Sequence, residues 1–145
     1  MGSVFNHVGH CVSDLERTRR FWVEVLGFEP WYEFAAPDES TARLLDLPEP
    51  VGLTAVYLRR DGFVLELLSF ADAGTNPPQG RVMNDVGLTH ISVSVDDIDA
   101  TVAKAVEYGG AVIERTNIGL AVMIRDPEGQ LVELLPMTFR ASLPD

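Results

Sequence analysis

Residues 6–27 read NHVGHCVSDLERTRRFWVEVLG, and residues 89–110 read THISVSVDDIDATVAKAVEYGG. The two stretches align without a gap. The matched pairs include His7 and His90, Val12 and Val95, Asp14 and Asp97, Thr18 and Thr101, and Gly27 and Gly110. Self-similarity of this kind indicates an architecture made of repeated units. The chain is therefore predicted to contain the same structural module twice.

Each copy reads as a strand followed by a helix. In the second copy, Ile91, Val93 and Val95 alternate with a histidine and two serines, which is the period of a strand. Apolar residues then recur at helical spacing. They are Leu15, Trp22 and Leu26 in the first copy, and Ile98, Val102, Ala105 and Val106 in the second. Ser13 and Asp96 are expected to cap these two helices.

The repeat continues into a last strand. Residues 62–68 read GFVLELL and residues 129–135 read GQLVELL, so each copy has a glutamate four positions after a glycine. These glutamates are Glu66 and Glu133. Each copy also has room for two more strands before its last one. These are expected at residues 28–36 and 52–60, and at residues 111–116 and 119–125.

The pattern predicts an α+β protein made of two tandem βαβββ modules. Module one spans about residues 4–70 and module two about residues 86–137, within one domain of residues 1–145. The extra residues of copy one, 35–51, are expected to form a loop or lid. Residues 71–85 contain Gly, Pro and Asn and are expected to link the modules.

Composition excludes several classes of protein. Hydrophobic residues make up 46% of the 145 residues, enough for a folded core. The net charge is −11 and basic residues do not cluster, which argues against binding to nucleic acid. No apolar run could span a membrane, and the N-terminal residues lack the features of a signal peptide. Cys11 is the one cysteine, so no internal disulfide can form, and a cytoplasmic location is predicted.

Strand parity places one histidine of each copy on the sheet face away from the helix, and pseudo-symmetry of the two repeats could bring one glutamate of each copy to the same concave face. His7 and Glu66 form the first pair, and His90 and Glu133 form the second. Two imidazoles and two carboxylates suit a divalent metal of borderline character, such as zinc, nickel, cobalt, manganese or iron(II). A single histidine or glutamate in a strand is usually structural or solvated. The repetition of both residues at matched positions favours a metal site.

Other residues near this pattern have less specific interpretations. His10 matches Val93 on the side facing the helix, which favours a packed histidine over a ligand. Cys11 matches Ser94 and is expected to fill space, because no arrangement that would activate a nucleophile is visible. Aromatic residues follow the first helix, and alternate ones are expected to face the site. They are Trp31, Tyr32 and Phe34.

Three stretches together resemble the vicinal oxygen chelate superfamily, which includes glyoxalase I, methylmalonyl-CoA epimerase, extradiol dioxygenases and fosfomycin or bleomycin resistance proteins. They are NHVGHCVSDLERTRRFWVEVLGFE, GLTHISVSVDDIDATV and DPEGQLVELL. The resemblance covers about residues 4–137. It implies two modules that form a cupped, barrel-like mixed sheet and associate as a homodimer. It also implies a divalent metal bound by His7, Glu66, His90 and Glu133.

The predicted function is that of a metal-dependent lyase or isomerase of glyoxalase-like type. It would act on a small oxygenated carbonyl substrate through a metal-stabilised enediolate and proton transfer, with epimerase or isomerase chemistry. Glu133 and Glu66 are the candidate catalytic bases. Two alternatives remain open: an extradiol-type iron(II) dioxygenase, and a non-catalytic resistance protein that binds a small molecule. Nucleic acid and membranes are not expected partners.

Overall fold

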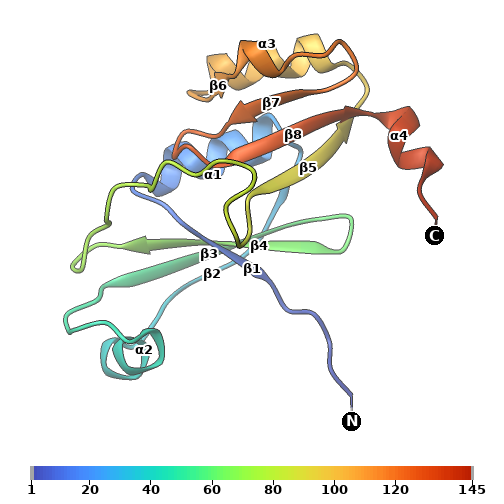
Figure 1. Cartoon of the computed structure of the whole chain (residues 1–145). Helices are drawn as coiled ribbons and strands as arrows, with labels where there is room; N and C mark the ends of the chain where they lie inside the picture. The colour runs from blue at the N-terminus through green and yellow to red at the C-terminus, as the bar shows by residue number, and fades with distance from the viewer. Residues whose placement is uncertain (1, 145) are drawn as a thin grey trace. The chain divides into compact units, whose positions relative to one another are not determined.

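The structure, a computed structural model, describes residues 2–144 (Figure 1). The predicted domain limits, residues 1 and 145, lie outside the described residues. The chain divides into two compact units. Unit 1 consists of the residues up to Arg19 together with Gly27–Pro77. Unit 2 consists of Arg20–Leu26 together with the residues from Pro78 onward. The first helix therefore contributes to both units.

Unit 1 is built on a mixed sheet of four strands in the order β1-β4-β3-β2. Its strands are β1 (Val8–Cys11), β2 (Glu29–Ala35), β3 (Leu53–Arg60) and β4 (Phe63–Phe70). Helix α1 (Leu15–Glu24) follows β1 in the chain. Strands β1 and β4 are parallel, and the other neighbours are antiparallel. The sheet has two free edges, so it does not close into a barrel by itself.

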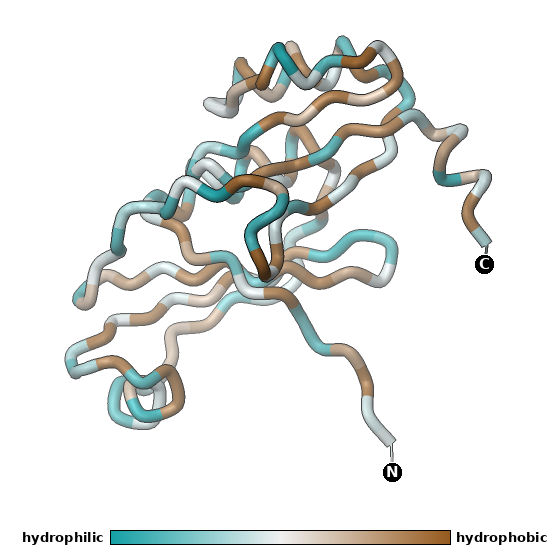
Figure 2. The backbone as a smooth tube through the Cα atoms, in the orientation of Figure 1, coloured by the Kyte–Doolittle hydropathy of each residue, from teal (hydrophilic) through white to brown (hydrophobic). Residues whose placement is uncertain are grey.

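Unit 2 repeats this topology, with strands in the order β5-β8-β7-β6. Its strands are β5 (His90–Val95), β6 (Ala111–Val112), β7 (Val122–Arg125) and β8 (Leu131–Pro136). Helix α3 (Ile98–Glu107) follows β5, a short 3-10 helix η1 (Glu114–Thr116) follows β6, and helix α4 (Met137–Ser142) ends the unit. Brown and teal segments alternate along α3, as expected of a helix with an apolar face (Figure 2). The predicted α+β class with two tandem βαβββ modules is confirmed.

The two modules also share the register of their parallel strands. Gly9 lies opposite Glu66 in unit 1, and Ser92 lies opposite Glu133 in unit 2. Side chains of opposite residues in a parallel pair point to the same face, and that face alternates along the strand. Leucine and valine at the intervening positions are fully buried. They are Leu65 and Leu67 in unit 1, and Val132 and Leu134 in unit 2.

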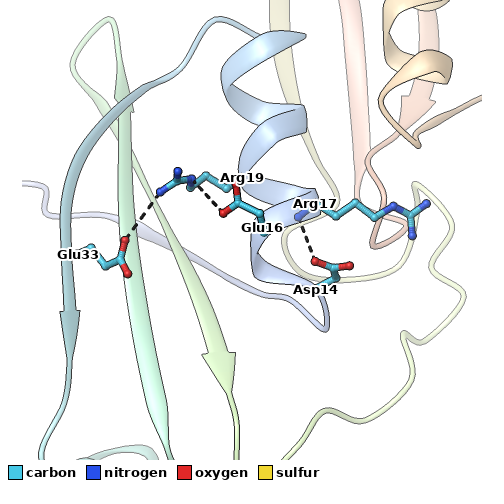
Figure 3. A network of polar contacts seen from close by, with 5 residues as sticks. All are labelled: Asp14, Glu16, Arg17, Arg19 and Glu33. Carbon is cyan, nitrogen blue, oxygen red and sulfur yellow. Dashed lines mark hydrogen bonds and ion pairs between the residues drawn. The ribbon is translucent and has the colours of Figure 1, made fainter.

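The helix caps lie one residue later than predicted from the sequence. Asp97 is the N-cap of α3, and its Oδ1 accepts a hydrogen bond from the backbone N–H of Ala100 at 2.9 Å. Asp14 makes the equivalent contact before α1, accepting from Arg17 N–H at 3.0 Å (Figure 3). The predicted cap Asp96 is wrong. Asp97 directly precedes the first turn of α3 and has an extended backbone, so its carboxylate is the one that reaches the backbone N–H of that turn.

An exposed arginine connects α1 to β2 within unit 1. The Arg19 guanidinium lies 3.6 Å from Glu16 on its own helix and 3.8 Å from Glu33 on β2 (Figure 3). Because Glu33 and Glu16 are both largely exposed, these ion pairs contribute little free energy of folding. The contact with Glu33 does show that α1 lies on the face of the sheet to which the Glu33 side chain points.

The stretch predicted to be a loop or lid contains helix α2 (Asp38–Leu45). Asp38 ties it to the start of β3, since its carboxylate accepts from the N–H groups of Val51 and Gly52 at 2.8 and 3.1 Å. Ala42 packs with buried Val51 and with a partly buried set of apolar residues. This set includes Ala36, Leu68 and Phe70. Because Leu68 is two positions from Glu66, α2 covers one end of the sheet face that carries Glu66.

The turn before β8 is organised by one buried carboxylate. Asp126 is 3% exposed and its Oδ1 accepts from the N–H groups of Glu128 and Gln130, each at 2.9 Å. Its Oδ2 accepts from the indole N–H of Trp22 at 3.0 Å. Gly129, at φ +93, completes the turn in a conformation that glycine adopts without strain. The Asp-Pro-Glu-Gly turn therefore positions β8 and also holds the C-terminal half of α1.

Within residues 2–144, the structure contains no helix with the length and apolar character needed to cross a lipid bilayer.

Candidate functional site

His7 and Glu66 lie together in unit 1. Glu66 is opposite Gly9, and His7 precedes Gly9 by two residues, so the two side chains share one face. His7 Nε2 is 3.6 Å from Glu66 Oε2. His7 Nδ1 donates a hydrogen bond to Asn6 Oδ1, because an amide oxygen only accepts. A neutral imidazole with its proton on Nδ1 has a lone pair on Nε2, and this is the form in which histidine binds a metal.

Tyr57 lies beside Glu66 on strand β3, whereas His7 approaches Glu66 from the β1 side of β4. Tyr57 lies directly opposite Glu66 in the β3–β4 ladder, so its side chain lies beside that carboxylate on the same face of the sheet. Glu66 is only 8% exposed, so a partner of this kind offsets the cost of burying its charge. Burial, followed by the hydrogen bond and negative charge of Glu66, raises the pKa of Tyr57 to about 12. The His7 ring meets the Tyr57 ring edge to face at 5.3 Å.

Further aromatic rings extend from Tyr57 along β2. The ladder between β2 and β3 shifts between Pro30 and Tyr32, which leaves Trp31 as an extra residue. A bulge of this kind bends the strand and redirects side chains. As a result, the consecutive residues Trp31 and Tyr32 both contact Tyr57, with ring centroids at 6.5 and 6.2 Å. Phe34 stacks on Tyr57 at 6.0 Å.

The prediction that alternate aromatic residues face this side is therefore incomplete. Tyr32 and Phe34 follow the alternation, but the bulge adds Trp31 to the same surface. Trp31 and Tyr32 are 53% and 60% exposed. We call Trp31, Tyr32, Phe34 and Tyr57 the aromatic surface of unit 1.

Unit 2 presents the matching pair, His90 on β5 and Glu133 on β8. Glu133 is opposite Ser92, so His90 lies two positions along the same face. The hydroxyl of Ser92 donates to Glu133 Oε1 at 2.6 Å. His90 Nδ1 is 2.9 Å from the Thr89 hydroxyl. Each unit therefore supplies one imidazole and one carboxylate on one sheet face.

Tyr57 and Ser92 were not identified as functional residues from the sequence, although signals for both exist. Arg60 pairs with Phe63 across a two-residue Asp-Gly turn in which both residues have positive φ. Asp-Gly between two strands is a strong hairpin signal, and counting back from it pairs Tyr57 with Glu66. Ser92 shares its face with His90 by simple alternation.

His10 and Cys11 occupy the sides that alternation predicts. His10 lies opposite the fully buried Leu67 and is half-buried, so it belongs to the face that packs against the core. Cys11 lies opposite Leu68 and is exposed.

The geometry of the unit 1 pair fits a shared metal ion. Two ligand atoms, each about 2.1 Å from a tetrahedral metal, are roughly 3.4 Å apart. His7 Nε2 and Glu66 Oε2 are separated by 3.6 Å. Neither described unit contains a group of three or more His, Cys, Asp or Glu side chains arranged to hold a metal. Metal sites usually have three or four protein ligands, so a single His–Glu pair is not a complete site.

Solved structures with the same fold include several proteins of the glyoxalase type. A glyoxalase family protein from Bacillus cereus is 20% identical with a TM-score of 0.77, covering 91% of this chain and 92% of its own. The trypanothione-dependent glyoxalase I of Leishmania major is 23% identical with a TM-score of 0.66, covering 93% and 89%. The fosfomycin resistance protein FosX from Listeria monocytogenes, complexed with Mn(II) and sulfate, is 15% identical with a TM-score of 0.61, covering 94% and 93%.

No match was found among curated proteins. The sequence model of one family matches residues 4–134, which is nearly the whole chain. The match agrees with the repeated βαβββ topology and with the resemblance carried by the His and Glu motifs. The chain belongs to the Glyoxalase/Bleomycin resistance protein/Dioxygenase superfamily.

Proposed function

We propose that this protein is a metal-dependent lyase or isomerase acting on a small substrate with a carbonyl and a neighbouring oxygen. The metal ligands are His7, Glu66, His90 and Glu133, contributed by one chain or by the two chains of a homodimer. The observation that carries the proposal is the repeated pair: each unit has one histidine and one glutamate, in the same register and on one face.

The donor set supports a borderline divalent metal. Two imidazole nitrogens and two carboxylate oxygens suit zinc, nickel, cobalt, manganese or iron(II), whereas calcium and magnesium prefer more oxygen ligands. The FosX structure with Mn(II) is in keeping with such an ion in this superfamily. When bound, the metal supplies Lewis-acid polarisation of the substrate carbonyl.

The carboxylates of the two pairs supply the proton transfer. Glu133 is the favoured base because it is half-buried and more accessible to a substrate than Glu66, which is only 8% exposed. The base removes the proton from the carbon next to the carbonyl. Returning that proton to the opposite face gives epimerisation, and returning it to the neighbouring carbon gives isomerisation.

The first test is metal content. The purified protein is dialysed against each candidate metal, desalted and assayed by plasma mass spectrometry. We expect one ion per His–Glu quartet in wild type and loss of that ion in His90→Ala. Absence of stoichiometric metal from wild type under all of these conditions would refute the proposed function.

The second test is proton exchange. Small α-hydroxyketones are incubated with metal-loaded protein in deuterated water, and loss of the α-proton signal is followed by NMR. We expect exchange with wild type and none with Glu133→Gln at a metal concentration that saturates the variant. Full exchange in that variant would exclude Glu133 as the base. Metal binding without any exchange by wild type would instead support a binding protein without this chemistry.

The aromatic surface of unit 1 supports a second candidate, an extradiol-type iron(II) dioxygenase. Trp31 and Tyr32 offer exposed rings close to Tyr57, which itself contacts the His7–Glu66 pair. A flat aromatic substrate would stack on such rings. Oxygen consumption by the iron(II)-loaded protein with catechols distinguishes this candidate from the first.

We also propose that the protein acts in the cytoplasm as a homodimer. The single cysteine is in keeping with a reducing compartment, and dimers are common in the superfamily. Size-exclusion chromatography with light scattering measures the dimer directly.

A further inference from the structure

Each of the two carboxylates has a residue with a hydroxyl group directly opposite it on a neighbouring strand. Tyr57 on the antiparallel strand β3 is opposite Glu66, and Ser92 on the parallel strand β5 is opposite Glu133. We propose that Tyr57 and Ser92 are equivalent positioning residues, each providing the hydroxyl that orients the glutamate carboxylate of its own unit. Their effect on metal binding rests on the proposed function, whereas their effect on the carboxylates does not.

In unit 1, Glu66 lies between Gly9 on β1 and Tyr57 on β3. Gly9 has no side chain to offer. The Tyr57 side chain, which ends in a hydroxyl, lies beside the carboxylate on the same face, and the carboxylate is buried next to the His7 imidazole. The donor thus comes from the antiparallel neighbour.

In unit 2, Glu133 lies between Ser92 on β5 and Met123 on β7. Met123 occupies the position that Tyr57 has in unit 1, but a thioether cannot donate a hydrogen bond. Ser92 occupies the position of Gly9 and donates to Glu133 Oε1 at 2.6 Å. The donor thus comes from the parallel neighbouring strand. In unit 1 the hydroxyl is on the antiparallel neighbour and the parallel neighbour has none, whereas in unit 2 the two strands have the opposite roles.

This exchange argues for a role in the site rather than in packing alone. A glutamate side chain has several rotatable bonds, so its carboxylate can adopt many orientations. Carboxylates that bind metals are usually held in one orientation by a hydrogen-bond partner. The Tyr57 contact is expected to matter more than the Ser92 contact, because Glu66 is buried whereas Ser92 is exposed and water competes for its bond.

The structure also offers a way to move the donor within unit 1. A Cβ added to Gly9 would lie 4.0 Å from Glu66 Oε1, so a serine hydroxyl there comes within reach of the carboxylate. Its tightest neighbour would be the tip of the Leu68 side chain at 3.3 Å, which can shift by a few tenths of an ångström. Gly9→Ser therefore gives unit 1 a serine hydroxyl on the parallel strand, at the position that Ser92 has in unit 2.

The first experiment is done without metal. A double-mutant cycle combines Tyr57→Phe with Glu66→Ala, and urea denaturation gives the unfolding equilibrium constant of each variant. With Glu66 present, we expect Tyr57→Phe to raise that constant about 10-fold or more, as for a hydrogen bond to a charged group. With Glu66→Ala, the same change should have a much smaller effect. Equal effects in the two backgrounds would overturn the inference for Tyr57.

The second experiment measures metal affinity by competition with a chromogenic chelator, using zinc or cobalt. We expect Tyr57→Phe to weaken binding about 10- to 100-fold, the usual effect of losing a group that orients a ligand. Tyr32→Phe is the matched control on the neighbouring ring and should bind like wild type. The double variant Tyr57→Phe/Gly9→Ser should regain most of the lost affinity, whereas Tyr57→Phe/Gly9→Ala should not.

Ser92→Ala is compared with Ser94→Ala, which removes a hydroxyl from the same face of β5. We expect weaker metal binding for Ser92→Ala, by a smaller factor than for Tyr57→Phe, and wild-type binding for Ser94→Ala. If Ser92→Ala and Ser94→Ala bind alike, or if alanine at position 9 rescues as well as serine, the inference is overturned. If wild type binds no metal, the proposed function fails, and the metal-free cycle still decides the hydrogen bond to Glu66.

Discussion

The indole Nε1 of Trp22 lies 3.0 Å from Oδ2 of Asp126, although the two residues are 104 positions apart in the chain. Both are buried, and Asp126 also accepts two backbone N–H groups of the turn that begins β8. One carboxylate thus satisfies three donors. The strand that carries Glu133 begins immediately after this turn, so the position of the candidate ligand depends on it.

Removing this carboxylate should destabilise the fold in graded steps. We expect Asp126→Ala to lower the free energy of unfolding by about 3 kcal/mol or more, because three donors lose their acceptor. Asp126→Asn keeps one carbonyl oxygen for the backbone groups and should cost about 1–2 kcal/mol. Urea denaturation measures both. An alanine variant as stable as the asparagine variant would contradict this ranking.

Gly110 is predicted to tolerate no side chain. A Cβ there would lie 2.6 Å from the Arg125 carbonyl oxygen and 2.6 Å from Cε2 of the Phe21 ring. The backbone oxygen has little freedom to move, so Gly110→Ala should cost about 1–3 kcal/mol through overpacking. Thermal denaturation checks this, with Gly80→Ala as the control, because a Cβ at Gly80 meets no atom within 4 Å. Equal melting temperatures for the two variants would refute the prediction.

The stability of the metal-free protein should fall at alkaline pH because of Tyr57. Burial and the neighbouring Glu66 raise the pKa of Tyr57 to about 12, whereas an unfolded tyrosine has a pKa of about 10. The resulting stabilisation is fully present below about pH 10 and is lost as the pH rises toward about 12, because only the unfolded state releases the proton in that window. Denaturation between these pH values measures the slope, which should be shallower in Tyr57→Phe. Absorbance at 295 nm should show the late-titrating phenol in wild type and not in the variant.

Loss of one imidazole should remove the metal without removing the fold. We expect His90→Ala to weaken metal binding by at least about 100-fold, more than the loss of an orienting group costs. His90 is half-buried at the start of β5, so circular dichroism of the metal-free variant should match wild type. His10→Ala is the control, since His10 pairs with Leu67 on the core-facing side and should leave metal binding intact. Equal metal affinity for His10→Ala and His90→Ala would show that His90 is not a ligand.

Helix α2 shows where local sequence signals were insufficient. Pro37, Asp38 and Glu39 read as loop residues, but acidic residues also suit the first turn of a helix. An eight-residue helix is marginal by itself, and this one depends on Ala42 packing with Val51 and on Asp38 binding the start of β3. These contacts come from residues outside the helix, so no local pattern contains them.

The tandem βαβββ modules, and the placement of each His–Glu pair on one sheet face, could be predicted from the sequence alone. Both depend on periods of 2 and 3.6 residues and on their repetition, which are properties of the chain itself. The tertiary structure decided which side chains lie beside each carboxylate: Tyr57 is opposite Glu66 across the β3–β4 ladder, and Ser92 donates to Glu133. It also placed Trp31 beside Tyr57 through a bulge. The physical reason is that cross-strand neighbours are set by turn geometry and register, which join residues far apart in sequence.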